Sequence, residues 1–239
     1  FLFVCWAKGL SILSSQRTSS QIYWLFSLFL SSDVITEFRG RGDEIHVYPL
    51  SFNEYMSVYE GNIDEAWDDY FNYGGMPLIL SYKSTDEKAN YLTSLFKKVY
   101  ISDIIERHKV KNVIELDELL DILSSSIGSL TNPLKLSKTF RSEKNKIITD
   151  KTINNYIGYL EDSFLINRTR RFDVKGKKYI NSPYKYYFED IGLRNARLNF
   201  RQTEENHVME NIIYNELKFL VESHFFDFLL LNNSELFWR

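Results

Sequence analysis

The chain has 239 residues, of which 44% are hydrophobic and 26% are charged. That length suits one large domain or two small ones, and the composition excludes wholesale disorder. The scarcity of Gly and Pro argues against collagen-like and turn-dense all-β folds. A single Cys excludes an intramolecular disulfide framework and fits a cytoplasmic location. Because the net charge is −3, any affinity for nucleic acid requires a local basic patch.

Residues 1–32 differ in composition from the rest of the chain. They contain no Asp or Glu and include the apolar run Ile22–Leu30. This run is too short for a membrane-spanning helix, which needs about 20 residues, so we expect no contact with a membrane. A membrane-anchored protein that uses this run is the rival interpretation. A signal peptide, a buried strand or helix, and a segment outside the native reading frame also remain open. The apolar end, residues 225–239, is interpreted as a domain cut short.

The part from residue 33 to residue 131 has mostly helical patterns. A short strand is predicted at Ile45–Tyr48, where Pro49 ends it. Ser51 and Glu54 have the spacing of a capping box, which predicts that a helix begins after Ser51. The remaining signals predict four further helices: one at 64–73 that ends at Gly74-Gly75, one that begins at Pro77, and amphipathic helices at 86–105 and 116–127.

The stretch 132–189 has a different pattern of predicted elements. A short helix follows Asn132-Pro133, and a second helix is capped by Thr149 or Asp150. The apolar face of the second helix is predicted to hold Ile153, Tyr156, Ile157 and Leu160. Two strands, 164–172 and 178–188, follow and are joined by a turn at 173–177. Two helices and a hairpin in this order predict a winged helix-turn-helix.

The charge of this stretch is strongly positive. Between Lys135 and Lys185 there are 13 Lys or Arg and five Asp or Glu, a local balance of +8. Such a patch is typical of nucleic-acid binding, and DNA is the expected partner. The candidate contact residues are Lys146, Lys151, Asn154 and Asn155 at the second helix, and Arg170, Arg171, Lys175, Lys177 and Lys178 on the wing. A solvated face or a protein-docking module remains an alternative.

Several common catalytic patterns are missing from the chain. No glycine begins the pattern G-x-x-x-x-G-K-[ST], so the chain has no nucleotide-binding loop and we expect no bound cofactor. None of the four His has a second His or Cys at metal-binding spacing, so no metal site is expected. Arg39 and Arg41 flank Gly40 and suit contact with a phosphate, or they form a solvated surface loop.

A long amphipathic helix is predicted at 204–221, and it carries two acidic side chains of interest. Glu210 and Glu216 lie on this helix, whose other faces are apolar. A carboxylate at either position suits the metal site of a nuclease-like fold. An exposed pair, or a salt bridge to Lys218, is the alternative interpretation.

Three phrases in order carry a family resemblance: EFRGRGDEIHVYPLSFNEY (37–55), YFNYGGMPL (70–78) and YYFEDIGLRNARLNFRQTEENHVMENIIYNEL (186–217). This order resembles the predicted prokaryotic AAA-type ATPases that carry the C-terminal domain of unknown function 4143. The resemblance covers about residues 31–224. It implies ATP and Mg²⁺ as cofactors of the intact family, a phosphate-sensing role for Arg39 or Arg41, and Glu210 as the first-helix acid of a restriction-endonuclease-like domain.

The composition of the N-terminal part and the resemblance together give a mixed α/β, helix-rich fold with five parts. They are an atypical segment (1–32), the C-terminal remnant of a P-loop ATPase core (33–60), a helical lid-like region (61–131), a winged helix (132–189), and the start of a nuclease-like domain (190–239). The chain lacks the nucleotide loop and ends before the later nuclease acids. We therefore expect a fragment of an AAA-family ATPase that does not bind ATP by itself. The alternative functions are a DNA-binding winged helix and a protein-interaction module that binds another copy or a partner protein.

Overall fold

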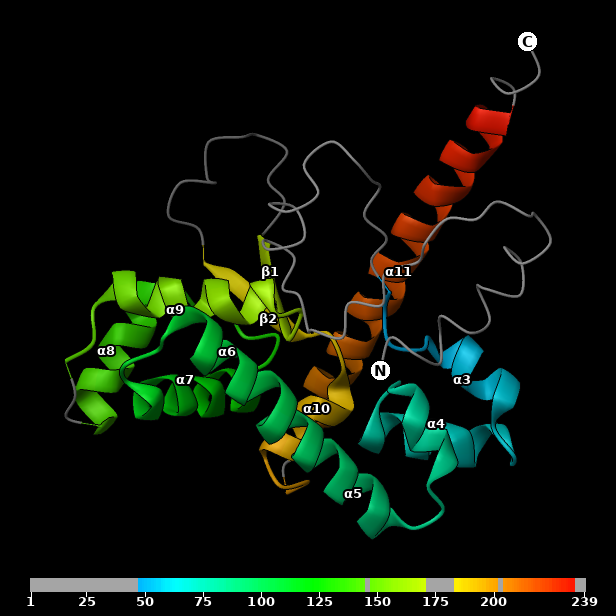
Figure 1. Cartoon of the computed structure of the whole chain (residues 1–239), viewed down its shortest axis with the longest axis horizontal. Coiled ribbons are helices and arrows are strands. Elements are labelled where there is room, and N and C mark those ends of the chain that lie inside the picture. Colours follow the sequence, from blue (N-terminus) through cyan, green and yellow to red (C-terminus); the bar gives the residue numbers. More distant parts are fainter. Residues whose placement is uncertain (1–46, 145–146, 171–182, 202–203, 235–239) are drawn as a thin grey trace.

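The computed structural model describes residues 47–144, 147–170, 183–201 and 204–234. These residues form a helix-rich fold with a small two-stranded antiparallel sheet, as Figure 1 shows. Arg39, Arg41 and most of the expected ATPase-core remnant lie outside the described residues. Of that remnant, residues 47–60 contain helix α3 (Phe52–Val58) and no strand.

The predicted capping box at Ser51 is confirmed. The Ser51 hydroxyl accepts a 3.3 Å hydrogen bond from the backbone N–H of Glu54, and the Glu54 carboxylate accepts a 2.9 Å bond from the backbone N–H of Ser51. The predicted strand at Ile45–Tyr48 is wrong for Val47 and Tyr48, because residues 47–50 are irregular, and its first two residues lie outside the described residues. The N–H of Leu50 instead donates 2.8 Å to the carbonyl of Gly75, which pairs this segment with a loop.

Helix α4 (Ile63–Tyr73) and the long helical segment after it lie next to each other. Helix α4 ends at Gly74, whose φ of 73° is a backbone conformation that glycine adopts readily and other residues rarely adopt. A 3₁₀ helix, η1, then covers Pro77–Ser81. The expected single helix at 86–105 is divided into α5 (Thr85–Ser94), the π-helical segment η2 (Leu95–Ile101) and α6 (Ser102–His108). A π segment shifts which side chains face the core, and a pattern of 3.6 residues per turn does not reveal it.

The middle of the chain folds as three helices followed by the strand pair. These elements are α7 (Val113–Ser125), α8 (Pro133–Lys144), α9 (Asp150–Asp162), β1 (Ile166–Arg170) and β2 (Tyr184–Phe188). The strands pair antiparallel, with Ile166 opposite Phe188 and Arg170 opposite Tyr184. Both described strands are shorter than expected, and the predicted turn at 173–177 lies outside the described residues.

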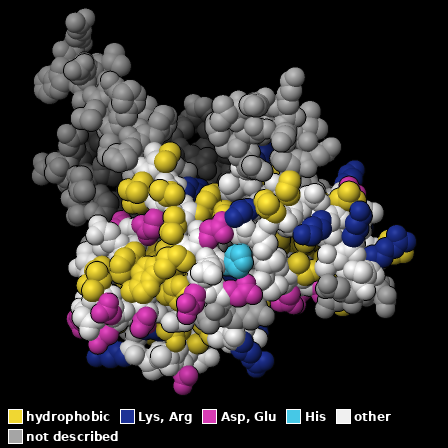
Figure 2. Space-filling model, turned by 180° about the vertical axis from the view of Figure 1, so that it is seen from behind, with side chains coloured by type: hydrophobic (Ala, Val, Ile, Leu, Met, Phe, Trp, Pro, Cys, Tyr) yellow, Lys and Arg dark blue, Asp and Glu magenta, His cyan; other side chains and the backbone are white. Residues whose placement is uncertain are grey.

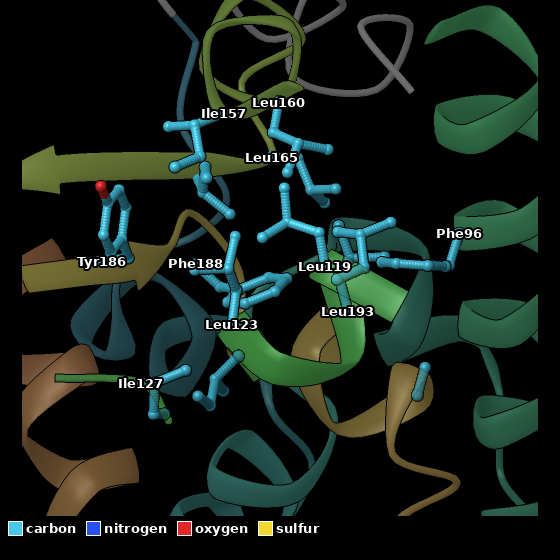
Figure 3. Close-up of a cluster of buried hydrophobic side chains, with 14 of the residues drawn as sticks. Phe96, Leu119, Leu123, Ile127, Ile157, Leu160, Leu165, Tyr186, Phe188 and Leu193 are labelled. Carbon is cyan, nitrogen blue, oxygen red and sulfur yellow. The ribbon is translucent and has the colours of Figure 1, made fainter. Parts of the chain in front are cut away.

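Side chains from these elements form one apolar cluster, shown in Figure 3. Leu119 and Leu123 of α7 face Ile157 and Leu160 of α9, and Phe188 of β2 is fully buried with them. Because α7, α9 and the strand pair share this cluster, their relative positions are fixed by burial of apolar surface. The outer faces of α9 and β1 are thereby held on one rigid unit.

Two helices complete the described chain. Helix α10 (Ile191–Arg197) is almost wholly buried, and α11 (Glu205–Ser234) begins on the body and extends away from it in Figure 1. Helix α11 is longer than the predicted 204–221. Among the residues that the structure describes, no helix combines the length and apolar character that crossing a membrane requires.

Candidate nucleic-acid interface

Helix α9 presents a polar face because the core occupies its apolar face. The buried side chains are those that the spacing predicts: Ile153, Tyr156, Ile157 and Leu160. The exposed polar side chains are Asp150, Lys151, Asn154 and Asn155. Thr149 is the N-cap, and its hydroxyl accepts a 3.1 Å hydrogen bond from the backbone N–H of Thr152.

Gly158 leaves the outer side of α9 open. It follows Asn154 by four residues, so the two lie on the same side of the helix. A Cβ added at Gly158 would meet no atom within 4 Å. The helix backbone at this position is therefore accessible to a surface that comes close to it.

Arg168 of β1 joins the strand to α9. Its Nη1 donates 2.8 Å to the side-chain oxygen of Asn154. Its Nε and Nη2 donate 3.1 Å and 2.6 Å to the two carboxylate oxygens of Glu161. This bidentate geometry orients the guanidinium, and the bond to Asn154 leaves the Asn154 NH₂ group as a donor.

Tyr184 of β2 lies beneath two arginines of β1. The guanidinium carbons of Arg168 and Arg170 lie 5.3 Å and 5.4 Å from the centroid of its ring. Both arginines project to the same side of the strand, since side chains two residues apart share a face. Arg170 is exposed, so the aromatic ring supports a cation at the surface.

The structure brings Lys151, Asn154, Asn155 and Arg170 onto neighbouring elements of one unit. Five other predicted DNA-contact residues lie outside the described residues, and the predictions for them stay untested: Lys146, Arg171, Lys175, Lys177 and Lys178. Arg168 and Tyr184 were missed by the sequence analysis. The alternation of Arg168 with Arg170 along a predicted strand was the available signal.

Glu210 belongs to α11, and its carboxylate contacts β2 and not α9. Its carboxylate forms an ion pair with Lys185 and accepts a 2.7 Å hydrogen bond from the hydroxyl of Tyr187. Partial burial alone would raise the pKa of Glu210, but the hydrogen bonds from Lys185 and Tyr187 hold this pKa below its usual value. The carboxylate is therefore used in a contact between a helix and a strand. Its role as a nuclease-like acid stays a prediction.

Two other charged groups of α11, Glu216 and Lys218, are also engaged. Glu216 accepts a 2.7 Å hydrogen bond from the backbone N–H of Phe52. Lys218 lies 3.3 Å from the carboxylate of Glu189. Glu210 pairs with Lys185 instead, and Glu216 accepts from Phe52, so neither forms the alternative bridge to Lys218. Within the described residues, no group of three or more His, Cys, Asp or Glu is placed to hold a metal ion.

A second polar centre connects the Gly74-Gly75 loop with α10. One carboxylate oxygen of Asp190 accepts 2.8 Å from the N–H of Gly75, and the other accepts 3.0 Å from the N–H of Leu193. Asp190 is the N-cap of α10 and is 2% exposed. A Cβ at Gly192 would collide with the carbonyl of Tyr73. Glycine at this position therefore lets α10 approach α4 closely.

Burial dominates the chemistry of this centre. It raises the pKa of Asp190 to about 6, although the bonds from backbone N–H groups act in the opposite direction. Arg194 is fully buried and donates 2.8 Å to the carbonyl of Ser124, which ties α10 to α7. Asn195 donates to the carbonyls of Phe71 and Asn72, at 3.2 Å and 2.9 Å, and ties α10 to α4. The segment Glu189–Arg197 (EDIGLRNAR) therefore connects α10 with α4, with α7 and with the loop at Gly75.

A comparison of the sequence with models of protein families identifies the family of this chain, through a match over its central region. A family model described as "Domain of unknown function (DUF8612)" matches residues 64–204, more than half of the chain. The chain belongs to the DUF8612 family. The matched region contains α4 to α10, and so includes both the helix–strand unit and the centre at Asp190.

Two curated relatives of this DUF8612 protein cover most of the chain. An uncharacterised protein of Haemophilus influenzae is 32% identical over 195 residues, which are 79% of this chain and 48% of the relative. The uncharacterised protein MJ1544 of Methanocaldococcus jannaschii is 25% identical over 225 residues, 89% of this chain and 50% of the relative. The chain spans about half the length of these relatives. No solved structure matches it significantly.

Proposed function

We propose that residues 113–188 form a winged helix that binds duplex DNA. The proposed recognition helix is α9, and the proposed wing is the β1–β2 pair. The support is the order of elements, since three helices precede an antiparallel pair whose core is shared with α7 and α9.

An isolated β-bridge between Thr131 and Tyr184 adds support for the winged-helix arrangement. Thr131, between α7 and α8, pairs with Tyr184 through two backbone hydrogen bonds of 2.9 Å and 2.7 Å. Gly128 donates 3.1 Å to the carbonyl of Tyr186. The linker between the first two helices therefore lies along β2, which fixes the strand pair against the helices.

The observation that carries the proposal is the hydrogen bond between Arg168 and Asn154. It joins the exposed face of α9 to the side of β1 that carries the arginines, so the two form one surface. In the proposed complex α9 enters the major groove, and the β1–β2 wing contacts the neighbouring DNA backbone. The open position at Gly158 lets this face approach a groove closely.

Separate roles follow from the donors and acceptors on this surface. We assign Asn155 to base contact, because an Asn amide can bond both N6 and N7 of adenine. Asn154 is less suited to that role, since Arg168 uses its amide oxygen. Lys151 and Arg170 are assigned to phosphates, where exposed cations position a protein without reading sequence.

The test is fluorescence anisotropy of a labelled mixed-sequence 24-base-pair duplex, titrated with the whole chain at several salt concentrations. Binding should weaken steeply with salt, and the Lys151→Ala, Arg170→Ala double variant should bind at least tenfold more weakly with a shallower salt slope. Lys83→Ala, at an exposed lysine before α5, is the matched control and should change nothing. Binding that is absent, or indifferent to both substitutions, contradicts the proposal and favours a protein-docking module.

For the intact protein we propose an AAA-type ATPase that carries this DNA-binding part. The support is the ordered resemblance of phrases 37–55, 70–78 and 186–217, together with relatives about twice as long as the matched region. The chain itself has no nucleotide loop. The nuclease-like character of residues 190–239 belongs to the same proposal.

A fluorescent ATP analogue tests this assignment. The full-length Haemophilus influenzae relative should bind it in a Mg²⁺-dependent manner, whereas this chain should not. Tight capture by this chain alone would contradict the proposal that the nucleotide pocket lies elsewhere. Failure of the relative to bind would contradict the ATPase assignment and would leave the DNA-binding proposal untouched.

A further inference from the structure

Two apolar stripes lie on the outer sides of neighbouring helices. On α4 the stripe consists of Ile63, which is exposed, and of Trp67 and Phe71, which are partly buried against the core. Ala66 and Tyr70 of the same helix are buried. On α11 the exposed apolar side chains are Met209, Ile213, Leu217, Leu220 and Val221. Ile63, Ile213 and Leu217 are 60%, 50% and 57% exposed, unlike typical core-facing positions of an amphipathic helix.

Phe52 connects the two stripes. Its ring lies 5.1 Å from that of Trp67, edge to face, and Trp67 lies 6.0 Å from Phe71. The backbone N–H of Phe52 donates 2.7 Å to Glu216 of α11, which lies between Ile213 and Leu217 in sequence. Helix α11 also packs against α4. The three elements α3, α4 and α11 are therefore in mutual contact. We take their outer apolar side chains together as one face.

Acidic side chains surround this face. Residues 47–82 contain six acids and no Lys or Arg. Asp69 is mostly buried in an ion pair with Lys88. The five exposed acids are Glu54, Glu60, Asp64, Glu65 and Asp68. Figure 2 shows hydrophobic side chains gathered on the back of the molecule, with acidic side chains along their margin. A large apolar patch with a polar margin is typical of an interaction surface.

We propose that this face binds an amphipathic helix of a partner protein whose polar side carries Lys and Arg. Two stripes at helical spacing suit an apolar helix face that lies along them. The acidic margin attracts cationic side chains and repels acidic ones, which determines the sign of the partner's charge. This proposal is independent of DNA binding, because it uses none of the residues of α9 or β1.

The probe is a labelled 18-residue helix of Leu and Lys, titrated with the whole chain in an anisotropy measurement. A peptide of the same pattern with Glu in place of Lys is the charge control. The Leu/Lys peptide should bind at least tenfold more tightly than the Leu/Glu peptide. The Ile213→Ser, Leu217→Ser double variant should lose at least tenfold in affinity for the Leu/Lys peptide.

Ile114→Ser is the matched control, because Ile114 is 68% exposed on α7 and lies outside this face. It should leave the affinity unchanged, and circular dichroism should show all variants to be equally helical. Equal binding of both peptides, or no loss in the double variant, overturns the proposal. Self-association that the double variant abolishes, seen by sedimentation velocity, would also overturn it, because the occupant would then be a second copy.

Discussion

The guanidinium of Arg168 donates a 2.8 Å hydrogen bond to the side-chain oxygen of Asn154 and links β1 to the exposed face of α9. The same guanidinium forms two hydrogen bonds with Glu161, near the other end of α9. One strand residue thus holds two positions of the helix. The orientation of the proposed DNA-binding face depends on this contact.

Arg168→Lys should therefore not be a conservative change. Lysine keeps the charge but cannot bond both carboxylate oxygens of Glu161 and the amide of Asn154 in one plane. We expect the free energy of unfolding to fall by about 1 kcal/mol, since the pair is only partly exposed. Urea denaturation measures this loss. A lysine variant as stable as the parent protein would show that charge alone matters here.

Asn155→Ala and Arg170→Ala should affect DNA binding differently. Loss of a base contact should cost about 1–3 kcal/mol on a preferred adenine-containing site and little on other sequences. Loss of a phosphate contact should weaken binding to all sequences and lower the salt slope by about one. Selection of preferred sites from a random duplex library, followed by titrations on selected and scrambled duplexes, separates these effects.

The buried Asp190 should make stability depend on pH. Its folded-state pKa of about 6 lies above the ordinary value of 3.8, so folding favours the protonated form. The stabilisation it contributes is complete below about pH 3.8 and is lost as the pH rises through about 6. The difference is on the order of 3 kcal/mol.

Asp190→Asn isolates this effect. Asparagine can still accept the N–H of Leu193 as an N-cap, but it carries no titratable proton. The difference in unfolding free energy between parent and variant should change across pH 4–6.5, with the parent losing relative stability as the pH rises. Parallel curves for the two proteins would contradict an elevated pKa at this carboxyl.

Two glycines should respond oppositely to alanine. Gly192→Ala places a Cβ against the backbone of Tyr73, so we expect a loss of about 3 kcal/mol. Gly158→Ala adds a methyl group in open space on a helix, and should stabilise by about 0.5–1 kcal/mol. Thermal unfolding of both variants is the measurement. A loss at Gly158 as large as that at Gly192 would contradict the described packing.

Glu210→Gln should have a small effect on stability. The carboxylate and Lys185 are both more than a third exposed, so we expect a loss of about 0.5 kcal/mol. Because the pKa of Glu210 is lowered, its contribution is present near neutral pH and is lost on acidification, opposite in sign to that of Asp190. Urea denaturation at pH 7 and pH 3.5 compares variant with parent. A loss of several kcal/mol would contradict a partly solvated ion pair.

The local features of this protein were predictable from its sequence. The capping box at Ser51, the N-cap at Thr149 and the buried face of α9 depend on residues within a few positions of one another. Hydrogen bonds at a helix end and the period of an α-helix act over that range, so a short segment determines them. The antiparallel pairing of the two strands was predicted from two strand patterns separated by a turn signal.

The long-range contacts were decided by the tertiary structure alone. Asp190 and Gly75 are 115 residues apart, and Glu216 and Phe52 are 164 apart. The sequence analysis interpreted Glu216 as an exposed acid or a partner of Lys218, because a helical pattern does not show which distant backbone N–H meets it. The burial that raises the pKa of Asp190 and the contact between Arg168 and Asn154 arise only when separate elements pack together, since desolvation and hydrogen bonding depend on neighbours in space.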